Sequence, residues 1–386
     1  MIRDPEQLRA LVDGVDRFVR DRLLPAEEIV EETDDIPADI IQDMRELGLF
    51  GLSVPEEYGG LGLTTEEEAH VIIALSWASP AYRSLIGTTV GIGSQGIVID
   101  GTPEQKAEFL PQLASGGKIA SFCLTEPDSG SDAGSLRTRA VRDGDHYVVN
   151  GTKRFITNAP HAGLFTLMAR TDPNEKGAAG VSAFIVDADS PGIRFGRKDA
   201  KMGMRGAHTC DVIFEDVRVP ADRIIGGVEG QGFKTAMKVL DKGRIHIGMI
   251  CVGAAQRILD EALRYATERR QFGQPIANFQ LVQAMLADSR AELYAARCMV
   301  MDAARRRDAG EAISTEAAAT KLFASEMAGR VADRALQILG GAGYTKEYVV
   351  ERFYRDVRLF RIYEGTSQIQ QLVIARNMIK QGSRVL

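Results

Sequence analysis

The sequence has 386 residues, of which 45% are apolar and 26% are charged, so it can form two or three domains with a large hydrophobic core. A net charge of −6 does not favour nucleic-acid binding, and no apolar run reaches the length needed to cross a bilayer. Four cysteines and five histidines are scattered without metal-binding or disulfide spacing, so we expect no metal site. The first residues resemble neither a signal peptide nor a transit segment, and we expect a cytoplasmic protein without nucleic-acid or membrane partners.

Residues 1–118 are predicted to form an N-terminal α-helical domain. Apolar residues recur at helical spacing between residues 8 and 19 and again between residues 40 and 47. Three glutamates follow Thr64-Thr65 and open a further helix, which ends near Ser79-Pro80. Thr102 followed by Pro103 has the pattern of an N-cap with proline at the first helical position.

Residues 119–228 are predicted to form a middle β domain. Period-two patterns indicate strands at 119–124, 147–149, 164–169, 181–186 and 211–214. Turn-forming residues lie between them, at Asp143-Gly144-Asp145, Asn150-Gly151, Asp172-Pro173-Asn174 and Ser190-Pro191-Gly192. Because loops rather than helices connect these strands, we predict an antiparallel barrel or sandwich and not a βαβ sheet.

Residues 229–386 are predicted to form a C-terminal α-helical bundle, which gives the order α, then β, then α. The helical segments at 233–270, 283–307 and 315–339 are long and rich in alanine. Gly243, Gly248 and Gly253 lie inside the first, where each costs up to about 1 kcal/mol relative to alanine. We infer that a neighbouring element or a ligand packs closely against them.

One short motif matches a nucleotide-binding pattern without its context. Residues 91–96 read Gly-Ile-Gly-Ser-Gln-Gly, the glycine pattern of dinucleotide-binding folds. That fold requires a strand before the motif, a helix after it, and an acidic residue about twenty positions further on. Both flanks here are helical, so we predict close helix packing or a loop that lines a pocket.

Residues 361–370 place Glu364 directly before a predicted helix. Ser367 and Gln370 have the spacing of a capping box, and Ile369, Leu372 and Val373, continued by residues 376–379, would form the buried face. Glu364 then lies on a short anchored loop before a flexible glycine, from which a carboxylate can point into a pocket as a base. An acidic residue stabilised by the helix dipole gives the same pattern, so the segment alone leaves both interpretations open.

Two other segments have the composition of a ligand site. Residues 123–135 are rich in hydroxyls, acids and glycines directly after a predicted strand, where backbone N–H groups can converge on a ligand. Residues 153–158 place Phe155 beside hydroxyl and amide groups, which suits a flat heterocycle. A solvated turn and an ordinary strand end would have the same compositions.

The whole chain resembles the acyl-CoA dehydrogenase family of flavoenzymes. Residues 123–135 fit the family's first signature at every position, and residues 337–344, continuing to Arg352 and Asp356, fit the second. Residues 363–369 match the catalytic loop of the short- and medium-chain members. The resemblance implies a helical N-terminal domain, a middle β domain and a C-terminal four-helix bundle, with FAD as cofactor and an acyl-CoA as substrate. It also implies a homotetramer, built as a dimer of dimers, with electron-transfer flavoprotein as the electron acceptor.

The resemblance assigns roles to individual residues. Glu364 resembles the catalytic base; the isovaleryl branch carries its base on the long helix, where this chain has Gly243. The implied flavin contacts are Phe122, Leu124, Thr125, Gly130, Ser131, Phe155, Ile156 and Thr157. The family usually has tryptophan where this chain has Phe155, so we expect ring stacking without an indole N–H contact. The implied contacts to the pyrophosphate and adenine from a neighbouring subunit are Arg269, Phe272, Gln280, Gln337 and Gly341, with Thr366 and Gln368 contributed by the catalytic segment.

The residues implied in substrate binding leave the acyl group open. Ser131, Asp241, Arg244, Tyr363 and Gly365 resemble thioester- and CoA-binding positions. Arg83, in a Tyr-Arg-Ser segment, resembles an arginine of the glutaryl-CoA branch that holds the distal carboxylate, and a guanidinium suits that role. A surface arginine or a salt bridge is the structural alternative. The C-terminal half resembles the short- and medium-chain branch, whereas tyrosine before the base resembles the decarboxylating type.

The implied reaction is α,β-dehydrogenation of an acyl-CoA to the trans-2-enoyl-CoA. Glu364 would remove the α-proton while the β-hydride passes to flavin N5. The alternatives are a glutaryl-CoA or other dicarboxylyl-CoA dehydrogenase, a desulfinase-like or oxidase relative, and a non-catalytic flavoprotein scaffold. The desulfinase type lacks the base glutamate, and Glu364 with Thr125, Ser131 and Arg244 argues against a scaffold. Oxygen reactivity and any decarboxylation are not determined by these residues.

Overall fold

The N-terminal part of the chain is helical, as expected. The computed structural model describes residues 2–175 and 177–382. Its first helices are α1 (Pro5–Phe18), α2 (Leu24–Thr33), α3 (Ala38–Glu46), α4 (Thr65–Leu75), α5 (Pro80–Gly87), α6 (Gln95–Asp100) and α7 (Pro103–Ala114). Thr64 and Thr102 each form a complete capping box with the residue three positions on, so both predicted helix starts are confirmed.

The glycine motif at residues 91–96 lies in helical structure. A π-helical segment (Thr88–Gly93) leads into α6, and no strand precedes it within residues 2–87. A Cβ atom on Gly93 would lie 2.6 Å from the Cβ of Ala120, so the glycine lets this segment approach the first strand of the sheet. The predicted close packing is confirmed and the dinucleotide interpretation is excluded.

The middle part of the chain forms a seven-stranded sheet. Its strands are β1 (Ile119–Cys123), β2 (Arg139–Asp143), β3 (His146–Thr157), β4 (Ala162–Arg170), β5 (Val181–Asp187), β6 (Ile193–Phe195) and β7 (Thr209–Pro220). The strand order is β1-β4-β2-β3-β7-β6, and β5 pairs with the other edge of β4, from Leu164 to Arg170. The ladders are antiparallel, as predicted, except that β1 and one residue pair of β2 run parallel to β4.

Parts of the strand prediction are wrong. Asn150-Gly151 is not a turn but lies inside β3, where the register against β7 shifts after Val149. A Cβ on Gly151 would lie 2.4 Å from the Oγ1 of Thr138, so the glycine serves a bulge and a close approach. The strands β2 and β6 were missed because most of their side chains are exposed, which removes the apolar alternation.

The C-terminal part of the chain forms the predicted long helices. They are α8 (Gly232–Glu268), α9 (Gln280–Asp308), α10 (Ser314–Leu339), α11 (Val349–Val357) and α12 (Ser367–Gln381), with a short β8–β9 hairpin (Arg270–Gln271, Gln274–Pro275) between α8 and α9. A Cβ on Gly248 would lie 2.9 Å from Thr320, and a Cβ on Gly253 would lie 2.4 Å from the carbonyl oxygen of Ile73. The glycines of α8 therefore permit close helix contacts.

The start and the buried face of α12 differ from the prediction. Thr366, not Ser367, is the N-cap, because its side chain accepts the N–H of Ile369. Ser367 instead donates to Glu326 at 2.6 Å. Leu372 is 53% exposed and Ile379 is 81% exposed, so the predicted buried face is wrong.

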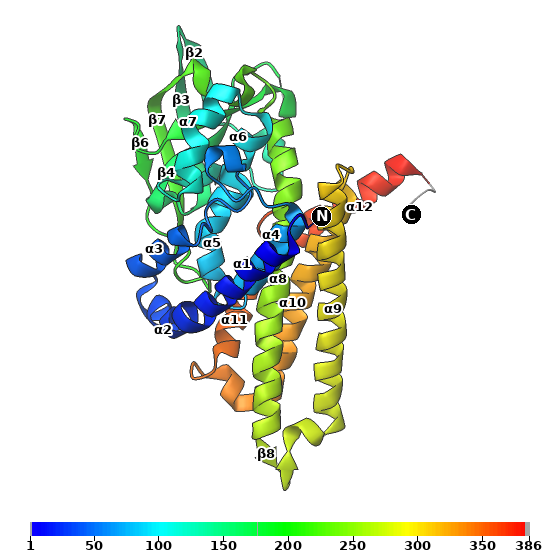
Figure 1. Cartoon of the computed structure of the whole chain (residues 1–386). Coiled ribbons are helices and arrows are strands. Elements are labelled where there is room, and N and C mark those ends of the chain that lie inside the picture. The colour runs from blue at the N-terminus through cyan, green and yellow to red at the C-terminus, as the bar shows by residue number, and fades with distance from the viewer. Residues whose placement is uncertain (1, 176, 383–386) are drawn as a thin grey trace.

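The three parts of the chain overlap along the long axis of the molecule (Figure 1). The sheet, with α6 and α7, lies at one end; α1–α5 lie in the middle; and α8 runs from the sheet to the β8–β9 hairpin at the opposite end, with α9 and α10 beside it. One hydrophobic core joins the N-terminal helices to the long helices, and two others occupy the two faces of the sheet. Within residues 2–175 and 177–382, no helix is both long and apolar enough to span a membrane.

Candidate active site

A cavity of about 550 Å³ lies where the sheet meets the helical part of the chain. The ends of β1 and β3 line one side, and α8, the loop before α12 and α12 itself line the other. The residues singled out from the sequence that line this cavity are Phe122, Leu124, Thr125, Gly130, Ser131, Phe155, Ile156, Thr157, Arg244, Tyr363, Glu364 and Gly365. Tertiary structure thus brings together segments that lie more than 200 residues apart in the chain.

The loop that carries Glu364 has a constrained backbone. Glu364 adopts φ 55° and Gly365 adopts φ 85°, the left-handed region that a non-glycine residue rarely occupies. The Nζ of Lys321 donates to the Gly365 carbonyl at 2.7 Å, and the side-chain amide of Gln370 donates to the carbonyls of Glu364 and Gly365, each at 3.0 Å. These three hydrogen bonds, with the Thr366 cap, hold the loop in a conformation of intrinsically higher energy.

Glu364 is half-buried, and its carboxylate packs against the long helix α8. A Cβ atom on Gly243 would lie 2.7 Å from its Oε2, so the absence of a side chain at this position of α8 makes room for it. Its Oε2 is buried and has no hydrogen-bond partner among the described residues. Burial raises the pKa of Glu364 above its usual value, although the charges of Arg83, Arg244 and Lys321 oppose this. A buried, unpaired carboxylate of raised pKa that borders a cavity can accept a proton from a ligand.

The loop after β1 is supported by a buried ion pair. The Nζ of Lys153 lies 2.8 Å from the Oε1 of Glu126 and donates to the carbonyl of Leu124 at 3.1 Å. Glu126 also accepts the backbone N–H groups of Arg137 and Thr138 at 2.6 and 2.8 Å. Although burial opposes it, the pKa of Glu126 is lowered by Lys153 and these hydrogen bonds. The pair positions the loop rather than contacting a ligand, which explains why composition did not identify it.

On the sheet side of the cavity, the end of β3 faces the loop after β1. Phe155 has φ 56° and its side chain is 59% exposed, with the guanidinium of Arg154 4.6 Å from the ring centre. The backbone N–H of Arg154 donates to the carbonyl of Thr125 at 2.8 Å, which joins this strand end to the loop after β1. An exposed aromatic ring beside Thr157, facing a cavity, suits stacking of a flat ring system.

These residues fit the flavin that the sequence resemblance implies. The cavity has an aromatic wall at Phe122 and Phe155, backbone and hydroxyl groups at Thr125, Ser131 and Thr157, and the carboxylate of Glu364 on the other side. A Cβ on Gly130 would meet nothing within 4 Å, so a ligand can approach the backbone there. A ring held between the strand ends and Glu364 would be contacted from both sides.

The residues predicted for CoA binding lie at or near the cavity. Arg244 lines it, is largely buried, and its Nη1 lies 2.5 Å from the Oδ1 of Asp241. Asp241 does not line the cavity, and burial raises its pKa. The Tyr363 ring stacks on Phe360 with centres 6.0 Å apart and forms part of the lining. Arg83 does not line the cavity but lies buried in α5, where its charge interacts with Tyr363 and Glu364.

The other predicted cofactor residues do not line this cavity. Arg269 and Gln280 flank the β8–β9 hairpin at the far end of the molecule, where Phe272 is 92% exposed (Figure 1). Gln337 and Gly341 are exposed at the end of α10. Thr366 caps α12 and Gln368 is exposed on its first turn. Their assignment to the site of a neighbouring subunit stays a prediction.

Sequence analysis did not identify several groups around the catalytic loop. Lys321 and Gln370 fix the loop, and Glu68 and His246 form a buried contact behind it at 2.9 Å. Gln370 was assigned to a capping box with Ser367 and not to the loop, whereas Lys321, Glu68 and His246 belong to no motif recognisable by spacing, because each comes from a different helix. The only available signal was a lysine or histidine within an otherwise apolar helical face.

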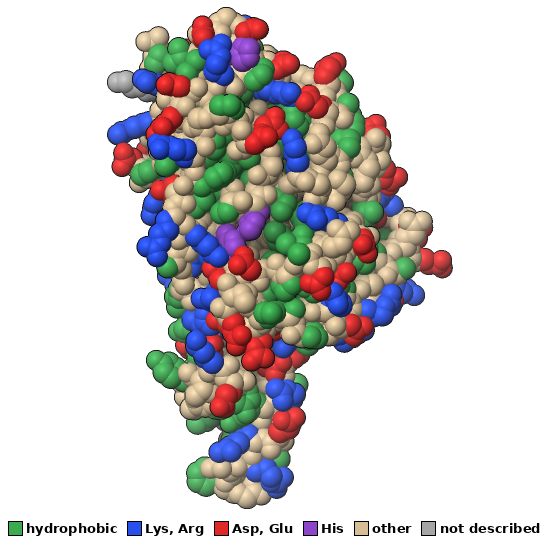
Figure 2. Space-filling model, turned by 90° about the vertical axis from the view of Figure 1, so that its left-hand side faces the viewer, with side chains coloured by type: hydrophobic (Ala, Val, Ile, Leu, Met, Phe, Trp, Pro, Cys, Tyr) green, Lys and Arg blue, Asp and Glu red, His purple; other side chains and the backbone are tan. Residues whose placement is uncertain are grey.

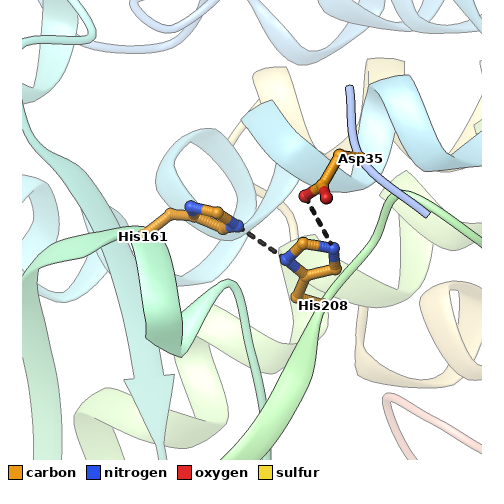
Figure 3. A group of neighbouring side chains, drawn as sticks. All are labelled: Asp35, His161 and His208. Atoms are coloured by element: carbon orange, nitrogen blue, oxygen red, sulfur yellow. Dashed lines mark hydrogen bonds and ion pairs between the residues drawn. The ribbon is translucent and has the colours of Figure 1, made fainter. Parts of the chain in front are cut away.

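Tertiary structure also brings two histidines together on the surface. The Nε2 of His161 lies 2.7 Å from the Nδ1 of His208, and the Oδ1 of Asp35 lies 3.3 Å from the Nε2 of His208 (Figure 3). In Figure 2, histidine side chains meet in a hollow near the middle of the face that is shown. Both ring nitrogens of His208 already have partners, since its Nε2 also contacts the carbonyl oxygen of Asp34. These contacts join the loop before α3 to the sheet.

Known proteins of one family match this chain over almost its whole length. Family models described as the N-terminal, middle and C-terminal domains of acyl-CoA dehydrogenase match residues 5–117, 121–217 and 230–379. The chain is 44% identical to the probable acyl-CoA dehydrogenase YngJ of Bacillus subtilis, over 98% of this chain and 99% of that protein. It is 43% identical to the caffeyl-CoA reductase-Etf complex subunit CarC of Acetobacterium woodii, over 91% of this chain and 92% of that protein.

Solved structures give the same result. The butyryl-CoA dehydrogenase of Megasphaera elsdenii superposes with a TM-score of 0.94 and 34% identity, covering 98% of this chain and 100% of that chain. A glutaryl-coenzyme A dehydrogenase in complex with glutaryl-CoA superposes with a TM-score of 0.93 and 32% identity, covering 98% and 97%. The chain belongs to the acyl-CoA dehydrogenase family and is an FAD-dependent oxidoreductase that acts on acyl-CoA thioesters.

Proposed function

We propose that this enzyme dehydrogenates an acyl-CoA between Cα and Cβ, with Glu364 as the base that removes the α-proton. The observation that carries this proposal is the carboxylate itself, whose Oε2 is buried and unpaired among the described residues and which borders the cavity. The α-proton of a thioester is only weakly acidic, so a carboxylate of raised pKa is a better acceptor than a solvated one. When bound, FAD supplies the oxidising power by accepting the hydride from Cβ.

The remaining lining residues would position the substrate. Thr125, Ser131 and Thr157 offer hydroxyl and backbone hydrogen bonds on the sheet side, and Arg244 offers a positive charge on α8. The backbone N–H of Glu364 is held in place by the constrained loop and can donate to the thioester oxygen as negative charge develops there. Apolar side chains along the cavity, including Ile92, Phe233 and Met237, would exclude water from the reacting carbons.

Substitution of the base tests this proposal directly. Anaerobic mixing of the yellow holoenzyme with butyryl-CoA should bleach the flavin, and Glu364→Gln should slow the bleaching by about 10²- to 10⁴-fold. Glu57→Gln, at an exposed glutamate outside the cavity, should leave the rate unchanged. If Glu364→Gln bleaches as fast as wild type, Glu364 is not the base.

A second candidate is dehydrogenation of a dicarboxylyl-CoA, favoured by the buried guanidinium of Arg83. Arg83 is 7% exposed, and its Nε has no hydrogen-bond partner among the described residues. A buried guanidinium is costly without an anion, and a distal carboxylate of the substrate could provide one. The structures of butyryl- and glutaryl-CoA dehydrogenases resemble this chain equally well, so the arginine and not the fold carries this candidate.

The acyl preference is tested by comparing kcat/KM for glutaryl-CoA with values for butyryl-, isobutyryl- and octanoyl-CoA. For a dicarboxylyl enzyme, glutaryl-CoA should have the highest value, and Arg83→Ala should abolish that preference. If a neutral acyl chain has the highest value and Arg83→Ala leaves the ratio unchanged, the second candidate falls. Release of carbon dioxide from glutaryl-CoA would report whether decarboxylation follows.

We further infer an electron partner and an oligomer. The relative from Acetobacterium woodii is a subunit of an Etf complex and is a reductase, so electron-transfer flavoprotein is the partner we infer, and the reverse reaction on an enoyl-CoA should be assayed with it. We expect a homotetramer in which Arg269, Phe272 and Gln280 complete a neighbour's FAD site, because Phe272 is almost fully exposed in one chain. Sedimentation analysis and the FAD content of Phe272→Ala test both expectations.

A further inference from the structure

Four charged or titratable side chains form a buried line behind the catalytic loop. The Nζ of Lys242 lies 3.1 Å from one carboxylate oxygen of Glu68, and the Nε2 of His246 lies 2.9 Å from the other. On the far side of the imidazole, the Nδ1 of His246 lies 2.7 Å from the Nη2 of Arg83. Lys242 and His246 belong to α8, Glu68 to α4 and Arg83 to α5, so the line joins three helices.

The direction of each contact follows from the chemistry of the groups. A guanidinium only donates hydrogen bonds, so the Nδ1 of His246 must accept from Arg83. The proton of the neutral imidazole is then on Nε2, beside the carboxylate of Glu68. A protonated imidazole would place two N–H donors against each other at 2.7 Å, so His246 is neutral. In agreement, burial lowers the pKa of His246 to about 4, and Arg83 and Lys242 act in the same direction.

The guanidinium of Arg83 is confined as well as hydrogen bonded. A Cβ on Gly87 would lie 2.5 Å from its Nη1, and a Cβ on Gly91 would lie 3.6 Å from its Nη2. The two glycines therefore form the wall against which it packs. The same group interacts electrostatically with Tyr363, Glu364, Glu68 and Cys251.

Among the buried atoms without a hydrogen-bond partner in this region are one nitrogen of Arg83 and one oxygen of Glu364. The Nε of Arg83 and the Oε2 of Glu364 each have no hydrogen-bond partner among the described residues. The two groups still interact through their charges, because Arg83 acts to lower the pKa of Glu364 and Glu364 acts to raise the pKa of Arg83. A direct ion pair would satisfy both groups and would be expected wherever the guanidinium is free to turn. It would also make the carboxylate a weaker base, because a paired carboxylate has a lower pKa.

We propose that His246 is a positioning residue that holds the guanidinium of Arg83 away from Glu364 and so keeps the catalytic carboxylate free to accept a proton. The negative charge of Glu68, 2.9 Å from Nε2, favours the tautomer that accepts from Arg83, and Lys242, 3.1 Å from Glu68, balances that charge. The other charged groups that interact with this line are Arg307 and Asp308, both near Lys242. The inference rests on the proposed role of Glu364 as the base.

The test uses the pH dependence of flavin bleaching by butyryl-CoA, a substrate without a distal carboxylate. His246→Leu removes the acceptor, and Arg83 is then expected to pair with Glu364. Bleaching should slow at least tenfold at neutral pH, and the acid limb of its pH profile should move down by about one pH unit. His246→Asn, whose side-chain oxygen can replace Nδ1, should stay close to wild type.

The double variant His246→Leu with Arg83→Met separates this role from a structural one. Without the guanidinium, the acid limb should return to or above its wild-type position, even if both variants are less stable. A His246→Leu profile that is unchanged or moved to higher pH overturns the inference, as does a double variant that keeps the low-pH limb. If Glu364→Gln bleaches at the wild-type rate, the proposed function fails instead, whatever His246→Leu does.

Discussion

Gly243 provides the sharpest test of how the long helix accommodates Glu364, the proposed base. A Cβ at this position would lie 2.7 Å from the Oε2 of Glu364, whereas ordinary contacts begin at 3.4 Å. In Gly243→Ala the carboxylate must therefore retreat by about 0.7 Å. Since a misplacement of about 1 Å can cost about 10²-fold in rate, we expect flavin bleaching to slow by about 10- to 100-fold.

The same substitution should not destabilise the protein. Alanine inside a helix is favoured over glycine by up to about 1 kcal/mol, and the atoms nearest to the new Cβ all belong to Glu364. Thermal unfolding should therefore give a midpoint at or above that of wild type. Gly14→Ala is a matched control, because a Cβ in α1 would meet only Arg17 at 3.9 Å. It should show a similar gain in stability and an unchanged bleaching rate.

A double-mutant cycle identifies the cause. The shorter side chain of Glu364→Asp withdraws the carboxylate from α8, so adding Gly243→Ala should then cost much less than it does in wild type. The reasoning is refuted if Gly243→Ala bleaches at the wild-type rate. It is equally refuted if the penalty is the same with aspartate as with glutamate.

Three further predictions concern stability. Burial raises the pKa of Glu364, so ionising it lowers the free energy of unfolding, and this loss grows as the pH rises above the pKa of glutamate in the unfolded chain. Glu364→Gln should therefore be more stable than wild type at pH 8, and the difference should vanish near pH 4. Melting curves that coincide with those of wild type at both pH values would contradict this. Lys153→Met leaves the buried carboxylate of Glu126 with only its backbone partners, so the free energy of unfolding measured with denaturant should fall by about 3 kcal/mol. Adding Glu126→Gln should recover part of this loss. An unchanged free energy of unfolding in Lys153→Met would mean that the ion pair is dispensable. Burial and the neighbouring His208 lower the pKa of His161. The stability that the neutral imidazole contributes is therefore present above the unfolded-chain pKa of about 6.5 and is lost as the pH falls below it. Wild type should lose more free energy of unfolding between pH 7 and 5 than His161→Gln, and parallel plots of that free energy against pH would exclude this origin.

Much of the architecture follows from local sequence patterns. Helices such as α4 and α7 have both a capping box and a periodic apolar face, and those signals act within one turn. The long helices α8 to α10 were similarly clear, because their apolar periodicity persists over many turns. Exposed strands such as β2 and the bulge at Gly151 were not, since their conformation depends on strand partners distant in sequence.

Some residues of the candidate site could likewise be predicted from the sequence, whereas the contacts between them could not. The catalytic loop, residues 123–135 and Phe155 were identified from the sequence, because each concentrates its chemical groups within a few positions and matches a family pattern. That Glu364 packs against Gly243 and has a raised pKa depends on α8 passing behind a loop that lies 121 residues further along the chain. Composition cannot report such a contact, because burial is a property of neighbours and not of the residue.

The sequence by itself predicted the order of helical and β segments and, through its family motifs, pointed to Glu364 as the proposed base and to the proposed wall of the flavin site. Only tertiary structure decided which groups support them: the Lys153–Glu126 pair, the Lys321 hydrogen bond and the contact between His246 and Arg83. The physical reason is that the first set depends on the period and the chemistry of adjacent residues. The second depends on where helices and strands far apart in the chain exclude water, and there each polar group must find a partner from another element.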